Sequence, residues 1–422
     1  SDTLDGGAGD RDMADYRDSD ASVTVNLAAG TASGGHAEGD VLRNIEYLSG
    51  SRHDDTLTGD DGNNALSGGA GNDVLRGGAG NWDWLEGGAG SDTLDGGAGR
   101  GDTASYAGSD AAVTVNLATG TARGGHAEGD VLRNIERLRG SNHNDTLTGD
   151  DGRNDLWGGA GADTLDGGAG DRDMADYRDS DASVTVNLAA GTASGGHAEG
   201  DVLRNIERLR GSDHNDTLTG DDGDNLLRAS AGSDTLDGMG GDGDTVAYWD
   251  SDAGVTVNLA AGTTSGGHAE GDVLRNIEHL DGSDHDDTLI GDDGDNDLNG
   301  GAGADTLNGG AGADTLDGGA GNDRFTGDAG EDTFRFVYDG GGADTVTDFN
   351  DGQDTVILDR DEFADIAAVA AAFVVVDADT LRLNRPGDGN SITFLIEDHE
   401  FTLEDLAAQL VSAGIGDVFE LA

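Results

Sequence analysis

The sequence predicts an all-β fold in which short strands stack, coil upon coil, into a solenoid. A nine-residue phrase recurs along the chain, Gly-Gly-x-Gly-x-Asp-x-U-x, where U is a large apolar residue. Residues 68–76 are one copy, and residues 300–308, 309–317 and 318–326 follow one another without a gap. Aromatic residues make up only 5% of the 422 residues, too few for conventional globular cores. A fixed short period is typical of repeats that bury their apolar side against their neighbours.

Each part of the phrase has a structural reason. The glycines permit a positive φ and therefore a tight turn, and the last three residues are long enough for one short strand. Two phrases then make one coil with two strands and two turns. The apolar position predicts a thin internal ladder, formed mostly by Leu66, Leu75, Leu94, Leu147, Leu165, Leu218, Leu307 and Leu316.

A longer period overlies the short one. The string GGHAEGDVLRNIE occurs at residues 34–46, 124–136, 195–207 and 266–278. In the first copy, alternating apolar and polar residues predict strands at 14–16, 23–27, 42–48 and 56–58. The residues expected to face inward there are Val23, Val25, Leu27, Ile45, Leu48 and Leu57.

These copies predict six domains. Residues 1–90 form a first module with two extra nonapeptide-like units, one of them lengthened by Trp82. The remaining ranges are three further modules, the terminal nonapeptides and a C-terminal segment, at 91–161, 162–232, 233–303, 304–335 and 336–422. Because residues 1–5 match residues 91–95, we expect the chain to begin inside a repeat of a longer polypeptide.

The chain is strongly negative, and Asp supplies most of its acidic residues. The net charge is −63, all 23 basic residues are Arg, and the acidic residues comprise 71 Asp but only 15 Glu. A salt-adapted surface would use Glu freely, whereas these Asp residues fall at one phase of the repeat, which indicates metal ligation. The sign of the charge excludes nucleic acid as a partner. There is no membrane span, since no run of eighteen apolar residues occurs, and the absence of Cys excludes disulfides.

The ligand chemistry expected at these turns is that of calcium. A calcium ion takes six to eight oxygens at about 2.3–2.6 Å, so two adjacent turns must share each ion through carboxylates and backbone carbonyls. The predicted carboxylate ligands are Asp55, Asp73, Asp92, Asp145, Asp163, Asp216, Asp234, Asp287, Asp305, Asp314, Asp323 and Asp332, in turns such as those opened by Gly68, Gly300, Gly309 and Gly318. Neutral carbonyl ligands at the same phase are Asn64, Asn154, Asn225 and Asn296.

Some turns depart from the phrase. Insertions precede Asp12, Asp83, Asp102, Asp173 and Asp244, and we expect distorted or empty sites there. Counting one ion for each pair of facing turns gives on the order of fifteen to twenty calcium ions.

From about Phe336 glycine thins and aromatic residues become frequent. Residues 360–372 and 403–412 are predicted to be helical, within a β-rich segment. A solenoid needs a cap on its exposed last coil, and this segment is the predicted cap.

The tandem nonapeptides resemble those of RTX (repeat-in-toxin, or hemolysin-type calcium-binding repeat) proteins. This resemblance implies a right-handed parallel β-roll, calcium-driven folding and export from a Gram-negative bacterium by a type I secretion apparatus that reads an uncleaved C-terminal signal. The tail is similar to that of serralysin-type members at residues 332–336, 344–349 and 352–358, and Asp417-Val418-Phe419 is similar to the end of such signals, although Glu420 interrupts it.

The histidines and tryptophans admit both a functional and a simpler interpretation. The histidine pairs, such as His36 with His53, recur 17 residues apart, but solvated turn residues are favoured over transition-metal ligands. Exposed or packed Trp side chains are favoured over sugar platforms. No H-E-x-x-H, G-x-S-x-G or Walker motif occurs, so the stretch is predicted not to be an enzyme.

The function predicted from the sequence is a calcium-binding structural or adhesive repeat region of a secreted or cell-surface protein, with self-assembly or a surface polysaccharide as further partners. The alternative is the C-terminal calcium-binding and secretion module of an extracellular protease, lipase or polysaccharide-modifying enzyme. The encoded sequence before Ser1 discriminates between the two. Carbohydrate binding along the roll is a third hypothesis.

Overall fold

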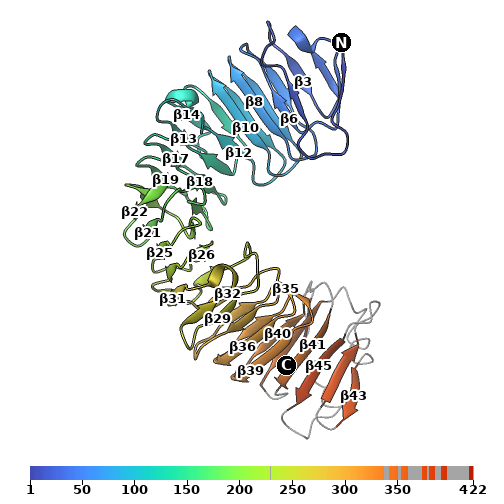
Figure 1. Ribbon diagram of the computed structural model, residues 1–422, viewed down its shortest axis with the longest axis vertical. Coiled ribbons are helices and arrows are strands. Elements are labelled where there is room, and N and C mark those ends of the chain that lie inside the picture. Colours follow the sequence, from blue (N-terminus) through green and yellow to red (C-terminus); the bar gives the residue numbers. More distant parts are fainter. Residues whose placement is uncertain are drawn as a thin grey trace. The chain divides into compact units, whose positions relative to one another are not determined.

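The computed structural model describes residues 1–228, 230–336, 342–349, 353–359, 373–377, 380–384, 391–396 and 418–421. The backbone divides into two compact units, Ser1–Ser212 and Asp213–Ala422, and short β-strands build both of them (Figure 1). Helical structure in the described residues consists of the 3-10 turns η1 (Gly35–Ala37), η2 (Gly125–Ala127), η3 (Gly196–Ala198) and η4 (Gly267–Ala269). Across these described residues, no helix has the length and apolarity needed to cross a membrane.

In the first unit the chain alternates between two sheets. The first sheet contains β1 (Thr3–Asp5), β3 (Thr24–Asn26), β4 (Thr31–Ser33), β5 (Val41–Arg43), β7 (Thr56–Thr58), β9 (Val74–Gly78), β11 (Thr93–Gly97), β13 (Thr114–Asn116), β14 (Thr121–Arg123), β15 (Val131–Arg133), β17 (Thr146–Thr148), β19 (Thr164–Asp166), β21 (Thr185–Asn187), β22 (Thr192–Ser194) and β23 (Val202–Arg204). The second sheet contains β2 (Met13–Asp15), β6 (Tyr47–Ser49), β8 (Ala65–Ala70), β10 (Trp84–Ala89), β12 (Thr103–Ser105), β16 (Arg137–Arg139), β18 (Asp155–Trp157), β20 (Met174–Asp176) and β24 (Arg208–Arg210).

The second unit follows the same plan. On one side lie β25 (Thr217–Thr219), β27 (Thr235–Asp237) and β31 (Val273–Arg275), and then β29 (Thr256–Asn258), β30 (Thr263–Ser265), β33 (Thr288–Ile290), β36 (Thr306–Ala311), β39 (Arg324–Ala329), β41 (Ala343–Phe349), β43 (Phe373–Asp377), β44 (Thr380–Asn384) and β45 (Ser391–Ile396). On the other lie β26 (Leu226–Arg228), β28 (Thr245–Ala247), β32 (His279–Asp281), β34 (Asp297–Asn299), β37 (Thr315–Asp317), β40 (Thr333–Phe336), β42 (Thr355–Asp359) and β46 (Val418–Leu421), while β35 (Ala302–Gly303) pairs with β38 (Ala320–Gly321).

The register confirms the predicted coil of two repeats. Leu57 pairs in parallel with Leu75, and Leu66 pairs in parallel with Leu85 on the other sheet. The predicted ladder leucines are all buried, as are Val23, Val25, Leu27, Ile45, Leu48 and Leu57. The fold is therefore a parallel β-roll, whose core is a single file of apolar side chains along each sheet.

The longer period inserts a different coil. In the first module β3, β4 and β5 form an antiparallel meander within the otherwise parallel first sheet. The single strand predicted at 42–48 is wrong, because Asn44 takes φ 51° and turns the chain between β5 and β6. Asn tolerates this left-handed conformation better than other residues with a Cβ.

Parallel stacking continues beyond residue 336. Phe325 of β39 pairs with Val346 of β41, and Phe334 of β40 pairs with Val356 of β42. Aromatic rings replace the leucine file here: the rings of Phe325 and Phe336 lie 5.3 Å apart, and those of Phe349 and Phe394 also lie 5.3 Å apart. Both predicted helices and most of the predicted secretion signal lie outside the described residues.

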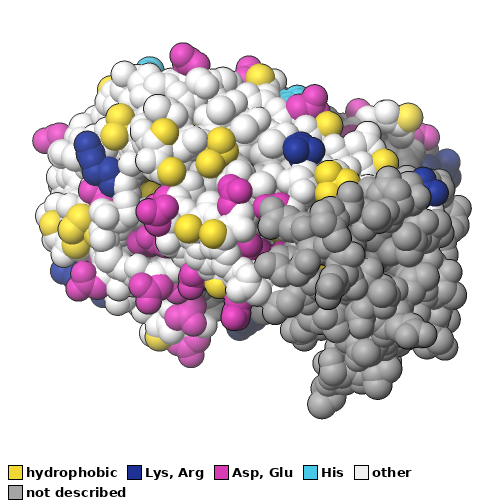
Figure 2. Space-filling model, turned by 90° about the horizontal axis from the view of Figure 1, so that it is seen from below, with side chains coloured by type: hydrophobic (Ala, Val, Ile, Leu, Met, Phe, Trp, Pro, Cys, Tyr) yellow, Lys and Arg dark blue, Asp and Glu magenta, His cyan; other side chains and the backbone are white. Residues whose placement is uncertain are grey.

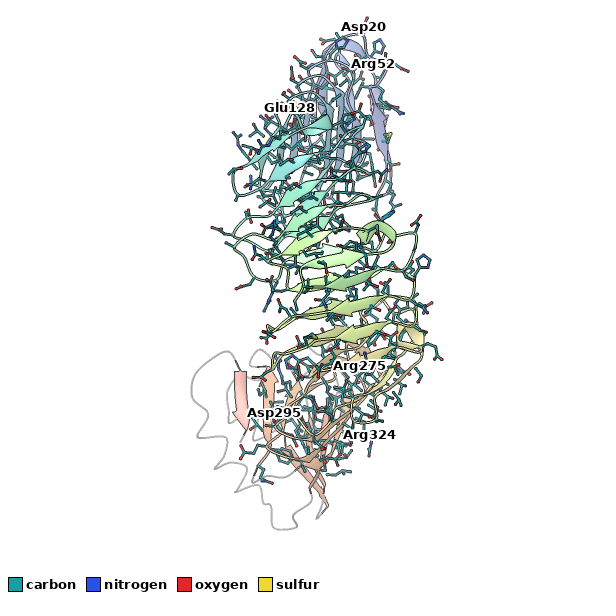
Figure 3. The ribbon with its side chains drawn as sticks, turned by 90° about the vertical axis from the view of Figure 1, so that its left-hand side faces the viewer. Asp20, Arg52, Glu128, Arg275, Asp295 and Arg324 are labelled. Carbon is teal, nitrogen blue, oxygen red and sulfur yellow. The ribbon has the colours of Figure 1, made fainter. Side chains whose placement is uncertain are left out.

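The surface carries the excess negative charge. Figure 2 shows carboxylate side chains spread over the visible described face, with few basic side chains among them. Charged residues such as Asp20, Arg52 and Glu128 are exposed and project away from the strands (Figure 3).

Because the core is one side chain wide, each ladder leucine should matter. Leu75→Ala should lower the free energy of unfolding of the calcium-loaded protein by about 2–5 kcal/mol, through lost burial and a residual cavity. Chemical denaturation followed by circular dichroism measures this. Val41→Ala is the control, since Val41 is 39% exposed and should change stability little. Equal effects of the two substitutions would contradict a core confined to the ladder.

Candidate metal-binding turns

The predicted ligand residues occupy one position in the fold, the last residue of a turn just before a strand. All of the predicted Asp and Asn residues are buried, each with at most 3% of its surface exposed. Those that enter the first sheet, or its counterpart in the second unit, define the first edge: Asp55, Asp73, Asp92, Asp145, Asp163, Asp216, Asp234, Asp287, Asp305 and Asp323. The second edge comprises Asn64, Asp83, Asp102, Asn154, Asp173, Asn225, Asp244, Asn296, Asp314 and Asp332.

Successive carboxylates along each edge are joined by hydrogen bonds into what we call the aspartate ladder. The backbone N–H of Asp55 donates to Oδ1 of Asp73 at 2.7 Å, and that of Asp73 donates to Oδ1 of Asp92 at 2.7 Å. On the second edge the N–H of Asp83 donates to Oδ1 of Asp102 at 2.9 Å. One carboxylate oxygen of each link is therefore satisfied by the neighbouring coil.

The other carboxylate oxygen is left without a hydrogen-bond donor in many turns. The buried Oδ2 atoms with no partner belong, among the predicted ligands, to Asp73, Asp92, Asp163, Asp234, Asp305 and Asp314. Burying a carboxylate oxygen without a hydrogen-bond donor costs free energy. No described side chain donates to these atoms, so a proton or a bound cation would have to offset this cost.

The first glycine of the phrase keeps space open beside this oxygen. A Cβ on Gly68 would lie within 2.7 Å of both Oδ2 of Asp73 and the carbonyl oxygen of Gly87, which belongs to the next coil. Gly300 stands in the same relation to Asp305 and the Gly318 carbonyl. At Gly309 and Gly318 a Cβ would meet the carboxylates of Asp314 and Asp323. The structure therefore brings one carboxylate and one carbonyl of adjacent coils together at a space the size of a small group.

Turns with an inserted residue keep this arrangement. The extra residue Trp82 takes φ 62° and Arg172 takes φ 71°, so the turn absorbs it. Asp83, Asp102, Asp173 and Asp244 are fully buried, and each has an unpartnered Oδ2. These four carboxylates are therefore placed as in the uninterrupted turns, whereas Asp12 is only partly buried; the distorted or empty metal sites expected in the five turns remain a prediction.

Other predicted ligands are already satisfied by the protein. Both oxygens of Asp55 accept hydrogen bonds: Oδ1 from the Ser51 hydroxyl at 3.0 Å and from the Val23 N–H at 2.6 Å, and Oδ2 from the Ser51 N–H. Ser141 and Ser283 do the same for Asp145 and Asp287. The signal was present in the sequence, because Ser replaces the second glycine of the phrase in these turns.

The asparagines behave similarly through their amide oxygens, although the buried Nδ2 of Asn64 has no partner. Oδ1 of Asn64 accepts the N–H of Asp60 at 2.6 Å, and Oδ1 of Asn154 accepts the N–H of Asp150 at 2.7 Å. The Asn154 amide also donates to the carbonyl of Glu136 at 3.2 Å. The amide thus fits the turn while carrying no charge.

Burial of the unpartnered carboxylates disfavours their charged form. Burial raises the pKa of Asp73 to about 7, and the neighbouring charges of Asp92 and Asp55 add to the shift against a lowering hydrogen bond from the Asp55 N–H. For the same principal reason the pKa of Asp234 is raised to about 8 and that of Asp173 to about 7. The metal-free roll therefore holds protons that an unfolded chain releases.

Within the described residues, side chains alone supply few potential metal ligands at any one place. In the parts of the chain that the structure describes, no three His, Asp or Glu side chains converge on one point. A cation held here would depend largely on backbone carbonyls, as calcium does, and not on imidazoles.

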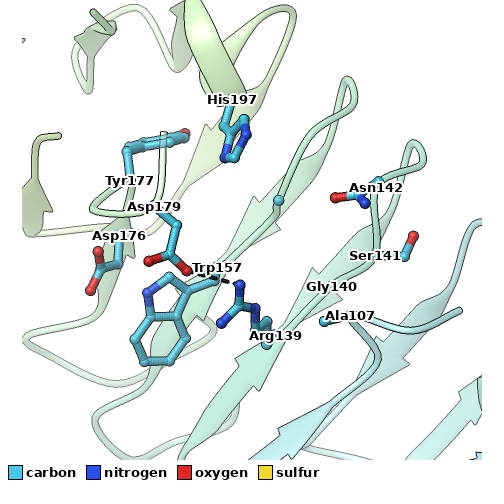
Figure 4. A pocket seen from close by; sticks show the side chains of 11 residues that line it. Ala107, Arg139, Gly140, Ser141, Asn142, Trp157, Asp176, Tyr177, Asp179 and His197 are labelled. Atoms are coloured by element: carbon cyan, nitrogen blue, oxygen red, sulfur yellow. Dashed lines mark ion pairs between the residues drawn. The ribbon is translucent and has the colours of Figure 1, made fainter. Parts of the chain in front are cut away.

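The tryptophans pack against arginines. The guanidinium of Arg137 lies 4.2 Å from the ring centre of Trp82 and 5.2 Å from that of Trp157. Beside Trp157 a cavity of about 50 Å³ is flanked by the 2.9 Å ion pair between Arg139 and Asp179 (Figure 4). This volume is far below the roughly 300–1,000 Å³ of ordinary small-molecule sites.

Comparison with known proteins agrees with the geometry of the turns. The family model of the RTX calcium-binding nonapeptide repeat (4 copies) matches residues 49–81, 82–101, 139–173, 210–244, 277–307 and 299–334. These segments are therefore RTX-type calcium-binding repeats.

A solved structure with some similarity is the crystal structure of extracellular lipase LipA from Serratia marcescens. Its identity with this chain is 18%, its TM-score is 0.22, and the match covers 64% of this chain. This chain spans only 39% of the lipase chain. No curated protein matches the sequence.

The raised pKa values predict an inverted pH dependence in chelator. An unfolded Asp has a pKa of about 3.9, so the folded, metal-free chain binds more protons than the unfolded chain. The stabilising contribution is complete below about pH 4 and is lost as the pH rises through the folded values of about 6 to 8. In EDTA at constant ionic strength, β-structure measured by circular dichroism should be greater at pH 5 than at pH 8.5. A gain of β-structure on raising the pH would contradict this assignment.

Proposed function

We propose that this chain is a calcium-loaded structural or adhesive repeat region of a secreted or cell-surface protein, which folds when calcium fills its turns. The observation that carries the proposal is the set of buried Oδ2 atoms without a donor, several of which lie beside a carbonyl of the neighbouring coil, as at Asp73 and Gly87. Calcium accepts this mixture of carboxylate and carbonyl oxygens. An ion between two coils would join them while neutralising their charges.

The energetic argument follows from the thin core. A leucine file one residue wide must offset both the ordering of the chain and the repulsion within a net charge of −63. Each calcium site contributes about 1.4 kcal/mol when free calcium is ten times the dissociation constant. Several such sites reach the roughly 5–15 kcal/mol by which ordinary domains are stable. Calcium binding would then be the larger part of the folding free energy.

The proposed location of the folded chain, outside the cell, follows from the affinity of such calcium sites. Extracellular modules bind calcium with dissociation constants of roughly 0.1–1 mM, so such sites are empty in the cytosol and filled outside the cell. We propose that the chain stays unfolded during export and folds outside. The absence of Cys and the sequence similarity to type I secreted proteins support export by that route.

The arrangement of the site supports a structural or adhesive role more than a catalytic one. In the described residues one Asp or Asn side chain lies at each turn along each edge, and the small cavity beside Trp157 is flanked by an Arg–Asp ion pair. The exposed carboxylates spread over the visible described face (Figure 2) would suit self-assembly through shared cations or contact with a surface polysaccharide.

Calcium should therefore switch the fold. In EDTA at pH 8 the chain should give the circular dichroism of an unfolded protein, and millimolar calcium should produce a β spectrum. Magnesium at equal concentration should not substitute, because it demands a smaller octahedral shell. The same β content with and without calcium would overturn the proposal.

Single carboxylates should set the calcium requirement. Asp73→Asn removes the charge beside Gly68 and should raise the calcium concentration at the folding midpoint, as measured by circular dichroism. The control Asp61→Asn removes the same charge from an exposed residue outside the space beside Gly68, and should leave the midpoint nearly unchanged. Equal shifts for both variants would show that net charge, and not this site, controls folding.

A further inference from the structure

The coils inserted by the longer period lie outside the segments matched by the repeat family. In the second module the match stops at residue 101 and resumes at 139. Between them the chain forms β12, the meander β13–β14–β15 and the turn into β16. This coil has no nonapeptide of its own, yet it stacks in parallel on the repeats, with Leu94 beside Leu132 and Ala104 beside Leu138.

On the second edge, the inserted coil places the carbonyl oxygen of an asparagine where the repeats place the carbonyl oxygen of a glycine. Asn134 takes φ 50°, and its equivalents Asn44, Asn205 and Asn276 take φ values of 50–51°. A Cβ on Gly96 would lie within 2.7 Å of both the Asn134 carbonyl oxygen and Oδ2 of Asp102. Gly167 and Gly238 stand in the same relation to Asn205 with Asp173 and to Asn276 with Asp244. The left-handed asparagine thus reproduces the arrangement at Gly68.

The carboxylate at this place is buried and unpaired. Asp102 is fully buried, its Oδ1 accepts the N–H of Asp83 at 2.9 Å, and its Oδ2 has no partner. The inserted coil adds a second carboxylate, because Oε2 of Glu136 accepts the N–H of Asp102 at 2.9 Å. Asp173 with Glu207 and Asp244 with Glu278 repeat this pair at 2.9 and 3.1 Å.

On the first edge of the same coil, the protein itself donates hydrogen bonds to both oxygens of the carboxylate. Asp130 accepts the N–H of Asp92 at 2.7 Å on Oδ1, and its Oδ2 accepts the hydroxyl of buried Tyr106 at 3.1 Å. Tyr16, Tyr177 and Tyr248 make the same bond to Asp40, Asp201 and Asp272 at 3.0–3.2 Å. A phenol donor thus engages the oxygen that is unpartnered in the repeats.

We propose that each inserted coil completes one calcium site on the second edge and none on the first. The second-edge sites are formed by Asp12, Asn44 and Glu46, by Asp102, Asn134 and Glu136, by Asp173, Asn205 and Glu207, and by Asp244, Asn276 and Glu278. The ligand is a hard divalent cation bound by carboxylate and carbonyl oxygens. This inference rests on the proposed function, and it extends calcium binding to coils that the repeat family does not cover.

The test counts calcium ions bound to the full chain. In D102N/D173N/D244N the amide oxygen can keep the ladder hydrogen bond while the NH₂ group faces the proposed ion. By equilibrium dialysis in millimolar calcium, this variant should bind three fewer ions than the unaltered chain and keep its circular dichroism. The matched control D110N/D181N/D252N removes three exposed carboxylates from the same inserted coils and should bind the full number. If the first triple variant does not fold, D102N alone decides, with one ion fewer expected.

Replacing the tyrosines tests whether the first edge of the inserted coils lacks a calcium site. Y106F/Y177F/Y248F should bind as many ions as the unaltered chain while unfolding at a lower temperature, by the same amount at 1 and 10 mM calcium. A reduced ion number in this variant would overturn the assignment of the first edge. An unchanged number in D102N/D173N/D244N would overturn the second-edge sites. Failure of the unaltered chain to bind calcium would instead refute the proposed function.

Discussion

The structure depends on placing like charges in register. A roll built from one phrase puts every copy of Asp directly beside the next, at the spacing of neighbouring strands. The N–H groups of the adjoining coil satisfy one oxygen of each carboxylate, as between Asp55 and Asp73, but leave the other buried and unpaired. Only a proton, a cation or a further hydrogen-bond donor can relieve that second oxygen. The donor is the Ser51 backbone N–H at Asp55 and the Tyr106 hydroxyl at Asp130, whereas the other unpartnered copies are left to a proton or a cation.

Glycine serves two separate purposes in the phrase. Gly69 and Gly71 take φ values of 105° and 129°, which a residue with a Cβ rarely adopts. Gly68 does not need a positive φ, but a Cβ there would fill the space between Asp73 and the Gly87 carbonyl. The high glycine content therefore reflects both the path of the turn and the room that its oxygens require.

Much of this could be predicted from the sequence, because a strict period fixes which residues become neighbours. The leucine file and the burial of Asp73 follow from phase alone. The meander could not be predicted, since its chain reversals lie at glycines of positive φ, such as Gly30 at 63° between β3 and β4, which alternation of apolar residues does not reveal. The bond between Tyr16 and Asp40 was also missed, because it joins residues 24 positions apart that no repeat aligns. The serine beside Asp55 was visible as a break in the phrase, but its meaning needed the structure.

The aspartate ladder has a direction, and this makes the two termini of the roll unlike. In each link the N–H belongs to the earlier coil and the oxygen to the later one, as from Asp305 to Asp323. The first coil thus has carboxylate oxygens without a donor from the protein, and water can donate to them. The last coil instead has a buried backbone N–H that requires an acceptor. In the second unit Asp344 and Asp354 supply it, at 3.0 and 3.2 Å from the nitrogens of Asp323 and Asp332. Coils can accordingly be lost from the beginning at little cost in polar pairing, while the closing segment is chemically indispensable to the coils before it.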